Sequence, residues 1–178
     1  MKSLEINQFE EFYRFLLEYF PYDEVKEYHH YYDLLKRSIL NVEYEYDNGF
    51  QYIISYFELE NMVFIDYYAI CKNNQGKGIG TKVLTSFIKK FNKPVYLEVE
   101  LPDDEIKQGR IRFYQNIGFK LNQYEYIVPK KVSCTTDLNF YIMSYPQKID
   151  KDKFQVLYKQ IIEEVYQYKG VNYEEENI

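Results

Sequence analysis

A glycine-rich segment between residues 75 and 81 has the composition of an anion-binding loop. Glycine stands at alternate positions, as Gly76, Gly78 and Gly80, and it lacks the side chain that would keep a ligand away from the backbone. The segment is followed by apolar residues at helical spacing, namely Ile79, Val83, Leu84, Phe87, Ile88 and Phe91. The free N–H groups of a helix's first turn lie at the positive end of its dipole, which favours an anion. This pattern predicts a cradle for a diphosphate.

Two other phosphate-binding patterns do not match the segment. The dinucleotide fingerprint requires a third glycine three positions after the second, and this chain has Thr81 there. The nucleoside triphosphate loop requires four residues between its glycines and then Gly-Lys-Ser or Gly-Lys-Thr. Neither spacing is present, so both classes of nucleotide site are excluded for this loop.

The loop resembles the acetyl-CoA site of the GNAT acyltransferase superfamily. The family pattern is Gln/Arg-x-x-Gly-x-Gly/Ala at the junction of a strand and a helix, and this chain has the run Gln75-Gly76-Lys77-Gly78-Ile79-Gly80. A second segment, from Arg110 to Phe119, reads Arg-Ile-Arg-Phe-Tyr-Gln-Asn-Ile-Gly-Phe. It resembles the family's Ala-x-x-Phe-Tyr-x-x-x-Gly-Phe, and its Gly118 suits a helix C-cap independently of any family.

The resemblance covers residues 40–128 well and the flanking residues in outline. The chain departs from the pattern at Arg110, where the family usually has a small residue, and at Lys72, where a proline is common. Neither position belongs to the cradle. The resemblance implies an α/β (α+β) fold with a mixed, mostly antiparallel sheet of about seven strands flanked by helices. In the family that sheet splays between its fourth and fifth strands, and acetyl-CoA enters the opening.

Acetyl-CoA as acyl donor, with no metal, is the cofactor that the resemblance implies. The expected binding residues are the end of the preceding strand and the loop itself, namely Ala69, Ile70, Cys71, Gln75, Gly76, Lys77, Gly78, Ile79, Gly80 and Thr81. The backbone near Ile70 is expected to pair with the pantetheine arm like an added strand. Lys72, Lys77 and Lys82 either reach a phosphate or are solvated, as surface lysines usually are.

Tyr114 is the candidate for the proton donor. A CoA thiolate leaves more easily if a proton arrives as the C–S bond breaks, and in the family the tyrosine of this motif performs that step. The alternative is that Tyr114 only packs against the sheet, because the chain has 22 tyrosines.

Glu98 and Glu100 are the candidates for the general base. An ammonium group must lose a proton before it can attack a thioester, and strand alternation places Tyr96, Glu98 and Glu100 on one face. The Leu-Glu-Val run around Glu98 resembles the family's ribosomal-protein-alanine members, whose glutamate at this position is the base. Those members have arginine where this chain has Glu100, so a different acceptor pocket is expected. Asp66 is a weaker candidate for the base. The alternative to any catalytic role is that Glu98 and Glu100 only form an exposed polar face of the strand.

Histidine and cysteine give no competing chemistry. His29 and His30 are neighbours on a predicted helix and therefore diverge, so they do not form a metal pair. Cys71 and Cys134 are far apart and lack a metal or redox spacing. We interpret both cysteines as small apolar residues.

The patterns predict elements that would position these residues. A short strand is expected over residues 3–6, a helix capped by Asn7 with Glu10 up to Pro21, and a second helix from Asp23 to about Arg37. The apolar side of this second helix is expected to be Val25, Tyr28, His29, Tyr32 and Leu35. Strands are predicted over residues 42–47, 50–59, 62–70, 95–100, 119–128 and 138–145. The Asn48-Gly49 dipeptide predicts a hairpin, and Asp150 is expected to cap an additional C-terminal helix.

Length and composition indicate one globular domain. The chain has 178 residues, of which 46% are hydrophobic, so we expect a single domain over residues 1–170, with the cofactor-binding core at about 40–128 and an acidic tail at 171–178. The formal charge of −6 argues against nucleic acid as the main partner. No signal segment or membrane-length apolar run is present, so a cytoplasmic protein without a membrane partner is expected.

The sequence therefore predicts an N-acetyltransferase that acts by direct attack of an amine on acetyl-CoA. The acceptor is a primary amine of a small molecule or peptide, and the protein is a monomer or homodimer. The alternative is a catalytically silent module that binds CoA or a partner.

Overall fold

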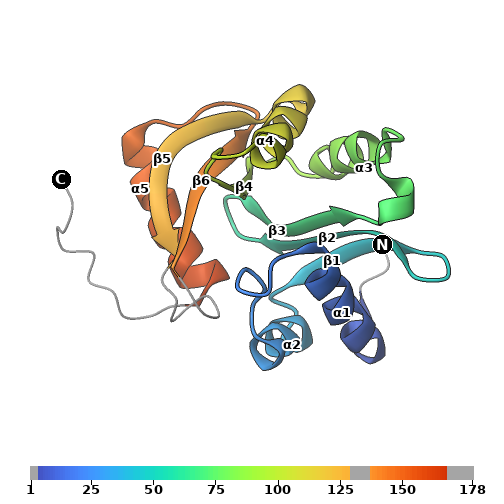
Figure 1. The fold of residues 1–178 in the computed structure, drawn as a ribbon. Helices are drawn as coiled ribbons and strands as arrows, with labels where there is room; N and C mark the ends of the chain where they lie inside the picture. The colour runs from blue at the N-terminus through green and yellow to red at the C-terminus, as the bar shows by residue number, and fades with distance from the viewer. Residues whose placement is uncertain (1–3, 129–136, 168–178) are drawn as a thin grey trace.

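The computed structural model describes residues 4–128 and 137–167. They form a mixed sheet of six strands in the order β1-β2-β3-β4-β6-β5 (Figure 1). The strands are β1 (Asn41–Tyr46), β2 (Phe50–Glu58), β3 (Val63–Ile70), β4 (Val95–Glu100), β5 (Lys120–Val128) and β6 (Leu138–Tyr145). Helices flank both faces, as the sequence predicted. The expected tail at 171–178 and Cys134 lie outside the described residues.

The helices are divided between two apolar cores, one on each face of the sheet. α1 (Phe9–Tyr19), α2 (Tyr28–Lys36) and α5 (Lys151–Gln160) bury their apolar residues in one core. α3 (Ile79–Ile88) and α4 (Glu105–Ile117) pack in the other. A π-helical turn (Ile161–Val165) continues α5. The additional C-terminal helix is therefore part of the core that also holds α1 and α2.

Several helix ends follow the sequence signals directly. The Asp150 carboxylate accepts a hydrogen bond of 2.8 Å from the Lys153 N–H and caps α5. Gly118 ends α4 with φ +114°, and a Cβ there would lie 3.2 Å from the Tyr145 ring. A glycine is thus required both by the left-handed backbone and by the close approach of a side chain.

The N-terminal segment differs from the prediction. The expected strand at residues 3–6 is not formed at residues 4–6, the part of it that the structure describes, and Ile6–Gln8 is a 3-10 helix that leads into α1. The predicted Asn7–Glu10 cap is also wrong, because Gln8 is the N-cap and makes no side-chain capping bond. Only Leu4 of this segment enters the core, whereas Ile6 is exposed. One buried side chain contributes too little apolar burial to hold this segment in the sheet. The described sheet therefore has six strands, whereas about seven were predicted.

The second helix begins later than predicted, and its predicted face is buried only in part, although Tyr32 and Leu35 pack against the core as expected. α2 starts at Tyr28 instead of Asp23, and its buried residues are Tyr31 and Leu34, whereas Tyr28 and His29 are exposed. The Tyr31 hydroxyl lies 2.9 Å from the Ser55 hydroxyl and 3.0 Å from the Asp66 carboxylate. Polar partners inside the core therefore determine which side of α2 faces the sheet.

The sheet opens between β3 and β4, which confirms the expected splay. These two strands are the fourth and fifth of the predicted order, which counted the strand expected at residues 3–6 as the first. These two parallel strands pair at only three positions, Val63 with Val95, Phe64 with Tyr96, and Ile65 with Leu97. A register shift opposite Ser55 and Tyr56 leaves Asp66 as an extra residue in β3. Such a bulge bends a strand and redirects its side chains. Beyond it, β3 and β4 continue without pairing to each other, so one backbone edge of β3 is left open.

Candidate active site

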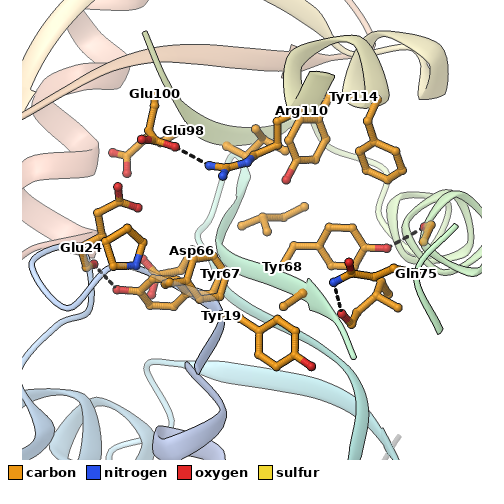
Figure 2. Close-up of a pocket in the computed structure, with 18 of the residues that line it drawn as sticks. Tyr19, Glu24, Asp66, Tyr67, Tyr68, Gln75, Glu98, Glu100, Arg110 and Tyr114 are labelled. Atoms are coloured by element: carbon orange, nitrogen blue, oxygen red, sulfur yellow. Dashed lines mark hydrogen bonds and ion pairs between the residues drawn. The ribbon is translucent and has the colours of Figure 1, made fainter. Parts of the chain in front are cut away.

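The opening between β3 and β4 contains a cavity of about 650 Å³ (Figure 2). Its walls come from the end of α1, the loop before α2, the diverging ends of β3 and β4, the glycine-rich loop, α4, β6 and Tyr166. Segments from across the whole sequence thus meet at the splay. One end of the cavity is formed by backbone and the other by charged side chains.

The glycine-rich loop forms the backbone end. Gly76 and Gly78 have φ of +73° and +75°, and a Cβ at either position would meet nothing within 4 Å. The two glycines are therefore needed for their left-handed conformation, and the space in front of them is open to a ligand. Both line the cavity, and Gly78 is the N-cap of α3. The first-turn N–H groups of α3 are thus presented at an accessible glycine surface, as an anion requires.

Gly80 has a different function from the other two glycines. A Cβ there would lie 3.2 Å from the Tyr68 hydroxyl and 3.5 Å from Phe113. The Tyr68 hydroxyl donates a hydrogen bond of 2.6 Å to the Gly80 carbonyl. The absence of a side chain at Gly80 therefore allows α3 to pack closely against β3 and α4.

The β3 end adjoins the loop. The Gln75 side-chain amide donates a bond of 2.9 Å to the Ile70 carbonyl, which ties the loop to the strand. Ala69 and Ile70 line the cavity along the open edge of β3. An open strand edge beside an anion cradle fits an elongated ligand that carries a diphosphate and an amide-containing arm.

The remaining residues expected to bind the cofactor lie at different distances from the cavity. Gln75 and Thr81 line it, whereas Cys71, Lys77 and Ile79 are not among the lining residues. The Cys71 thiol lies 3.7 Å from the Gln51 side-chain oxygen and packs on the α1 side of the sheet. Lys72 forms an ion pair of 2.9 Å with Glu18. The predicted loop is therefore at the cavity, but the lysine and cysteine side chains around it point elsewhere or into solvent.

Tyr114 reaches the middle of the cavity from α4. Its side chain is 8% exposed, and its hydroxyl points into the opening (Figure 2). Burial raises the pKa of Tyr114 to about 12, although the nearby Arg110 guanidinium acts in the opposite direction. Among the described residues, this hydroxyl has no hydrogen-bond partner in the protein. Tyr114 therefore keeps its proton at neutral pH and is free to donate it to a ligand.

Glu98 lies on the same cavity from the β4 side. Its carboxylate accepts hydrogen bonds from the Tyr126 hydroxyl and, at 2.7 Å, from the Tyr166 hydroxyl. Burial raises the pKa of Glu98 to about 8, while the Tyr166 hydrogen bond and the Lys26 charge lower it. A carboxyl with a pKa near neutrality exchanges a proton readily, as a general base must.

Glu100 is in a different electrostatic environment from Glu98. It forms ion pairs with Arg110 and, at 3.4 Å, with Lys107. Arg110 is one of the two departures from the family pattern, and the structure shows that its guanidinium lines the cavity beside this carboxylate (Figure 2). Strand alternation correctly placed Glu98 and Glu100 on one face, but of these two carboxyls only Glu100 forms ion pairs within the described residues.

Glu24 also lines the cavity, from the loop before α2, although no motif in the sequence pointed to it. Figure 2 shows its carboxylate directed toward Glu98 and Glu100. Burial raises the pKa of Glu24 to about 7, and the Glu100 charge contributes in the same direction. The loop is held in place by Tyr67, whose hydroxyl donates a hydrogen bond of 2.7 Å to the Glu24 carbonyl. Glu24 is therefore a second carboxyl poised near neutral pH.

Asp66 is occupied by a buried ion pair. It lies beside Lys26, and the two side chains are only 3% and 4% exposed. Asp66 also accepts the hydrogen bond from Tyr31. Both carboxylate oxygens of Asp66 thus already have partners inside the protein, so this geometry does not favour Asp66 as the base.

Within residues 4–128 and 137–167, no group of three His, Cys, Asp or Glu side chains is arranged to hold a metal ion. In the same part of the chain, none of the helices has the length and apolar character needed to cross a bilayer.

Comparison with known proteins relates this geometry to one family. The sequence profile of the acetyltransferase (GNAT) family matches residues 9–119. A protein of Bacillus subtilis (strain 168), named "Putative acetyltransferase YjbC", is 34% identical over 162 residues, which are 88% of this chain and 82% of that protein.

Solved structures share the fold. A structure named "Putative acetyltransferase from GNAT family", from Bacteroides thetaiotaomicron, superposes with a TM-score of 0.83 at 23% identity and covers 94% of this chain and 98% of that chain. Arabidopsis thaliana NAA60 in complex with acetyl-CoA has a TM-score of 0.62 at 12% identity, covering 81% of this chain and 96% of that chain. At these identities the structures report on the fold alone.

Proposed function

The chain belongs to the acetyltransferase (GNAT) family, and on this basis we propose that it transfers an acetyl group from acetyl-CoA to a primary amine of a small molecule or peptide. The observation that carries the proposal is the juxtaposition of three features in one cavity. The glycine cradle lies at one end, the Glu24, Glu98 and Glu100 carboxylates lie at the other, and the Tyr114 hydroxyl points between them.

The donor belongs at the glycine cradle. Acetyl-CoA supplies the acetyl group as an activated thioester. The amides of residues 75–81 are suited to its pyrophosphate, because Gly76 and Gly78 leave the backbone accessible. The open edge of β3 near Ala69 and Ile70 is suited to the pantetheine amides. Both interactions use the main chain, so they hold the donor in a defined position without depending on protonation.

The acceptor belongs among the carboxylates. An amine is a cation at neutral pH, and the acidic end attracts a cation. Glu98 accepts the ammonium proton, with Glu24 as the alternative base, because both carboxyls have a pKa near neutrality. Arrival of the cation favours the ionised form of these carboxyls. Glu100, which is paired with Arg110, positions the acceptor through its charge.

Tyr114 completes the transfer at the donor side. Backbone N–H groups at the open end of β3 polarise the acetyl carbonyl during attack by the neutral amine. Tyr114 then gives its proton to the departing sulfur, which avoids release of a free thiolate, and the proton that the nitrogen loses as the amide forms returns to the Tyr114 oxygen. The hydroxyl has no competing partner in the described protein, so no internal hydrogen bond must break first.

The test is thiol release from acetyl-CoA across a panel of diamines, polyamines, amino sugars, amino acids and peptides, with Glu98→Gln and Glu24→Gln beside the wild type. We expect turnover on one class of amine and a fall of about 100-fold or more in kcat for whichever variant removes the base. Calorimetry with CoA should give the same affinity for all three proteins. CoA binding without turnover on any amine would contradict the proposal and favour a silent CoA-binding module.

A further inference from the structure

The C-terminal helical segment reaches the candidate base directly. Tyr166, immediately after the π-helical turn, lines the cavity and donates a hydrogen bond of 2.7 Å to Glu98. The two residues are separated by 68 positions in the sequence. The other carboxylate oxygen of Glu98 accepts from Tyr126 of β5. Two tyrosine hydroxyls therefore hold both oxygens of one carboxyl.

The same helical segment also supports Tyr126. The Tyr158 ring of α5 packs on the Tyr126 ring at a centroid distance of 4.8 Å. The Tyr158 hydroxyl donates a hydrogen bond of 3.0 Å to the Ile127 carbonyl, which anchors α5 to β5. Tyr126 is therefore supported by the Tyr158 ring, which a phenylalanine at this position would keep, whereas the Tyr158 hydroxyl contacts an exposed backbone carbonyl.

The local geometry directs Tyr166 inward. The Tyr166 N–H bonds to the Ile161 carbonyl at 3.1 Å, five residues earlier. This widened turn brings Tyr166 beneath Ile161 on the buried side of the helix, and π-turns often occur at functional sites. The Lys26 ammonium lies 4.5 Å from the centre of the Tyr166 ring, and Tyr166 is only 9% exposed. The ring is therefore held by a cation–π contact as well as by packing.

We propose that Tyr166 is a positioning residue, which fixes the orientation of the Glu98 carboxyl toward the acceptor and makes the C-terminal segment a part of the active site. The inference rests on the proposed function, in which Glu98 is the base. A hydroxyl that donates to a carboxylate stabilises its charged form. Tyr166 therefore determines both where Glu98 points and how easily it ionises.

Tyr166→Phe is the direct test, because it removes the hydroxyl and keeps the ring against Lys26. Tyr158→Phe is the matched control, since it makes the same change on the same helical segment but removes a bond to a backbone carbonyl. We expect Tyr166→Phe to lower kcat by roughly tenfold and to shift the acidic limb of the kcat/KM profile upward by about one pH unit. Tyr158→Phe should leave both unchanged, and CoA affinity should stay the same in the two variants.

Several charged or titratable groups face Glu98 and can affect the pH dependence of kcat/KM. These groups are Asp66 of β3, Tyr126 of β5, Glu24 and Lys26 of the loop before α2, and Tyr166 after the π-helical turn. The pKa of Glu98 is therefore measured directly, by NMR titration of protein labelled with ¹³C at the glutamate carboxyls, with Glu98→Gln to identify the resonance. We expect this pKa to rise in Tyr166→Phe and to stay constant in Tyr158→Phe.

Two results would overturn the inference. One is an unchanged Glu98 pKa in Tyr166→Phe, and the other is an equal loss of kcat in the Tyr166 and Tyr158 variants. A full rate in Glu98→Gln would instead remove Glu98 as the base and contradict that part of the proposed function. The NMR titration needs no substrate, so it distinguishes these two failures. If Tyr166→Phe does not fold, Tyr166→Met also removes the hydroxyl and provides the same measurement.

Discussion

The two ends of the cavity recognise their ligands by different means. At the cradle the interacting groups are backbone amides, which Gly76 and Gly78 expose through left-handed φ angles of +73° and +75°. At the acidic end they are side chains, and Glu24 and Glu98 have pKa values raised to about 7 and about 8 by burial. The cradle therefore binds in the same way at any physiological pH, whereas the acidic end changes its charge within that range.

This difference between the two ends also separates the residues that bind acetyl-CoA from those that transfer protons. A group that does not titrate can hold a ligand but cannot move a proton, whereas a carboxyl with a pKa near neutrality can do both. Substitutions at the cradle should therefore change the affinity for acetyl-CoA. Substitutions of proton-transferring side chains should change turnover.

The largest expected effect is that of Tyr114→Phe, compared with Tyr68→Phe. The first variant removes the hydroxyl that points into the cavity, and kcat should fall by about 100-fold to 10,000-fold with little change in CoA affinity. The second removes the hydroxyl that bonds to the Gly80 carbonyl, so it should weaken CoA binding and preserve kcat. Steady-state kinetics together with CoA calorimetry separate the two. If Tyr114→Phe retained the wild-type kcat, Tyr114 would not be the proton donor.

A smaller effect is expected for Gly78→Ala, compared with Gly109→Ala. An alanine at Gly78 must adopt φ near +75°, a strained conformation for a residue with a Cβ. The amides at the start of α3 then shift, and affinity for acetyl-CoA should fall by roughly tenfold, or about 1.4 kcal/mol. Gly109 lies within α4, and a Cβ there has an ordinary contact of 3.7 Å with Arg112. Equal affinities of the two variants would contradict a backbone cradle.

The smallest effect concerns stability as a function of pH. The pKa of Glu98 is about 8 in the folded protein and 4.5 in its ordinary state, so the folded state binds this proton more tightly than the unfolded state does. Its stabilising contribution is complete below pH 4.5 and is lost as the pH rises through about 8. We expect the Tm to decline by a few degrees between pH 5 and pH 8.5, and Glu98→Gln to reduce that decline.

Asp103→Asn is the control, because the pKa of Asp103 is shifted in the opposite direction from that of Glu98. The hydrogen bond from Lys107 lowers the pKa of Asp103, so its contribution to stability is present at neutral pH and is lost on acidification. This variant should leave the decline above pH 5 unchanged. A decline of the same size in Glu98→Gln and in the wild type would show that Glu98 is not the group responsible.

Much of the fold follows from local signals in the sequence. β4 and β6 were predicted with their observed ends, and the Asn48-Gly49 turn has the positive φ angles, +50° and +125°, that such a hairpin requires. These elements are defined by residues close together in the chain. The predicted strand is not formed at the described residues 4–6, and the predicted face of the second helix was correct for Val25, Tyr32 and Leu35 but wrong for Tyr28 and His29. Partners elsewhere in the core decide whether such short segments pair and which side they bury.

The sequence by itself determined the cradle and the position of Tyr114 in its motif. Both depend on short spacings, and the left-handed conformations at Gly76, Gly78 and Gly118 are a local property of the backbone. The site roles assigned to them remain predictions.

Only the tertiary structure decided the acidic end. Glu24 and Lys26 come from a loop that the sequence predicted as the start of a helix, and Tyr126 and Tyr166 reach Glu98 from positions 28 and 68 residues away. The tertiary structure also gave neighbouring glutamates different environments, since Arg110 lies beside Glu100 whereas tyrosines surround Glu98. Burial and the distance between charges determine how a carboxyl titrates, and the linear sequence specifies neither until the splayed sheet brings these segments together.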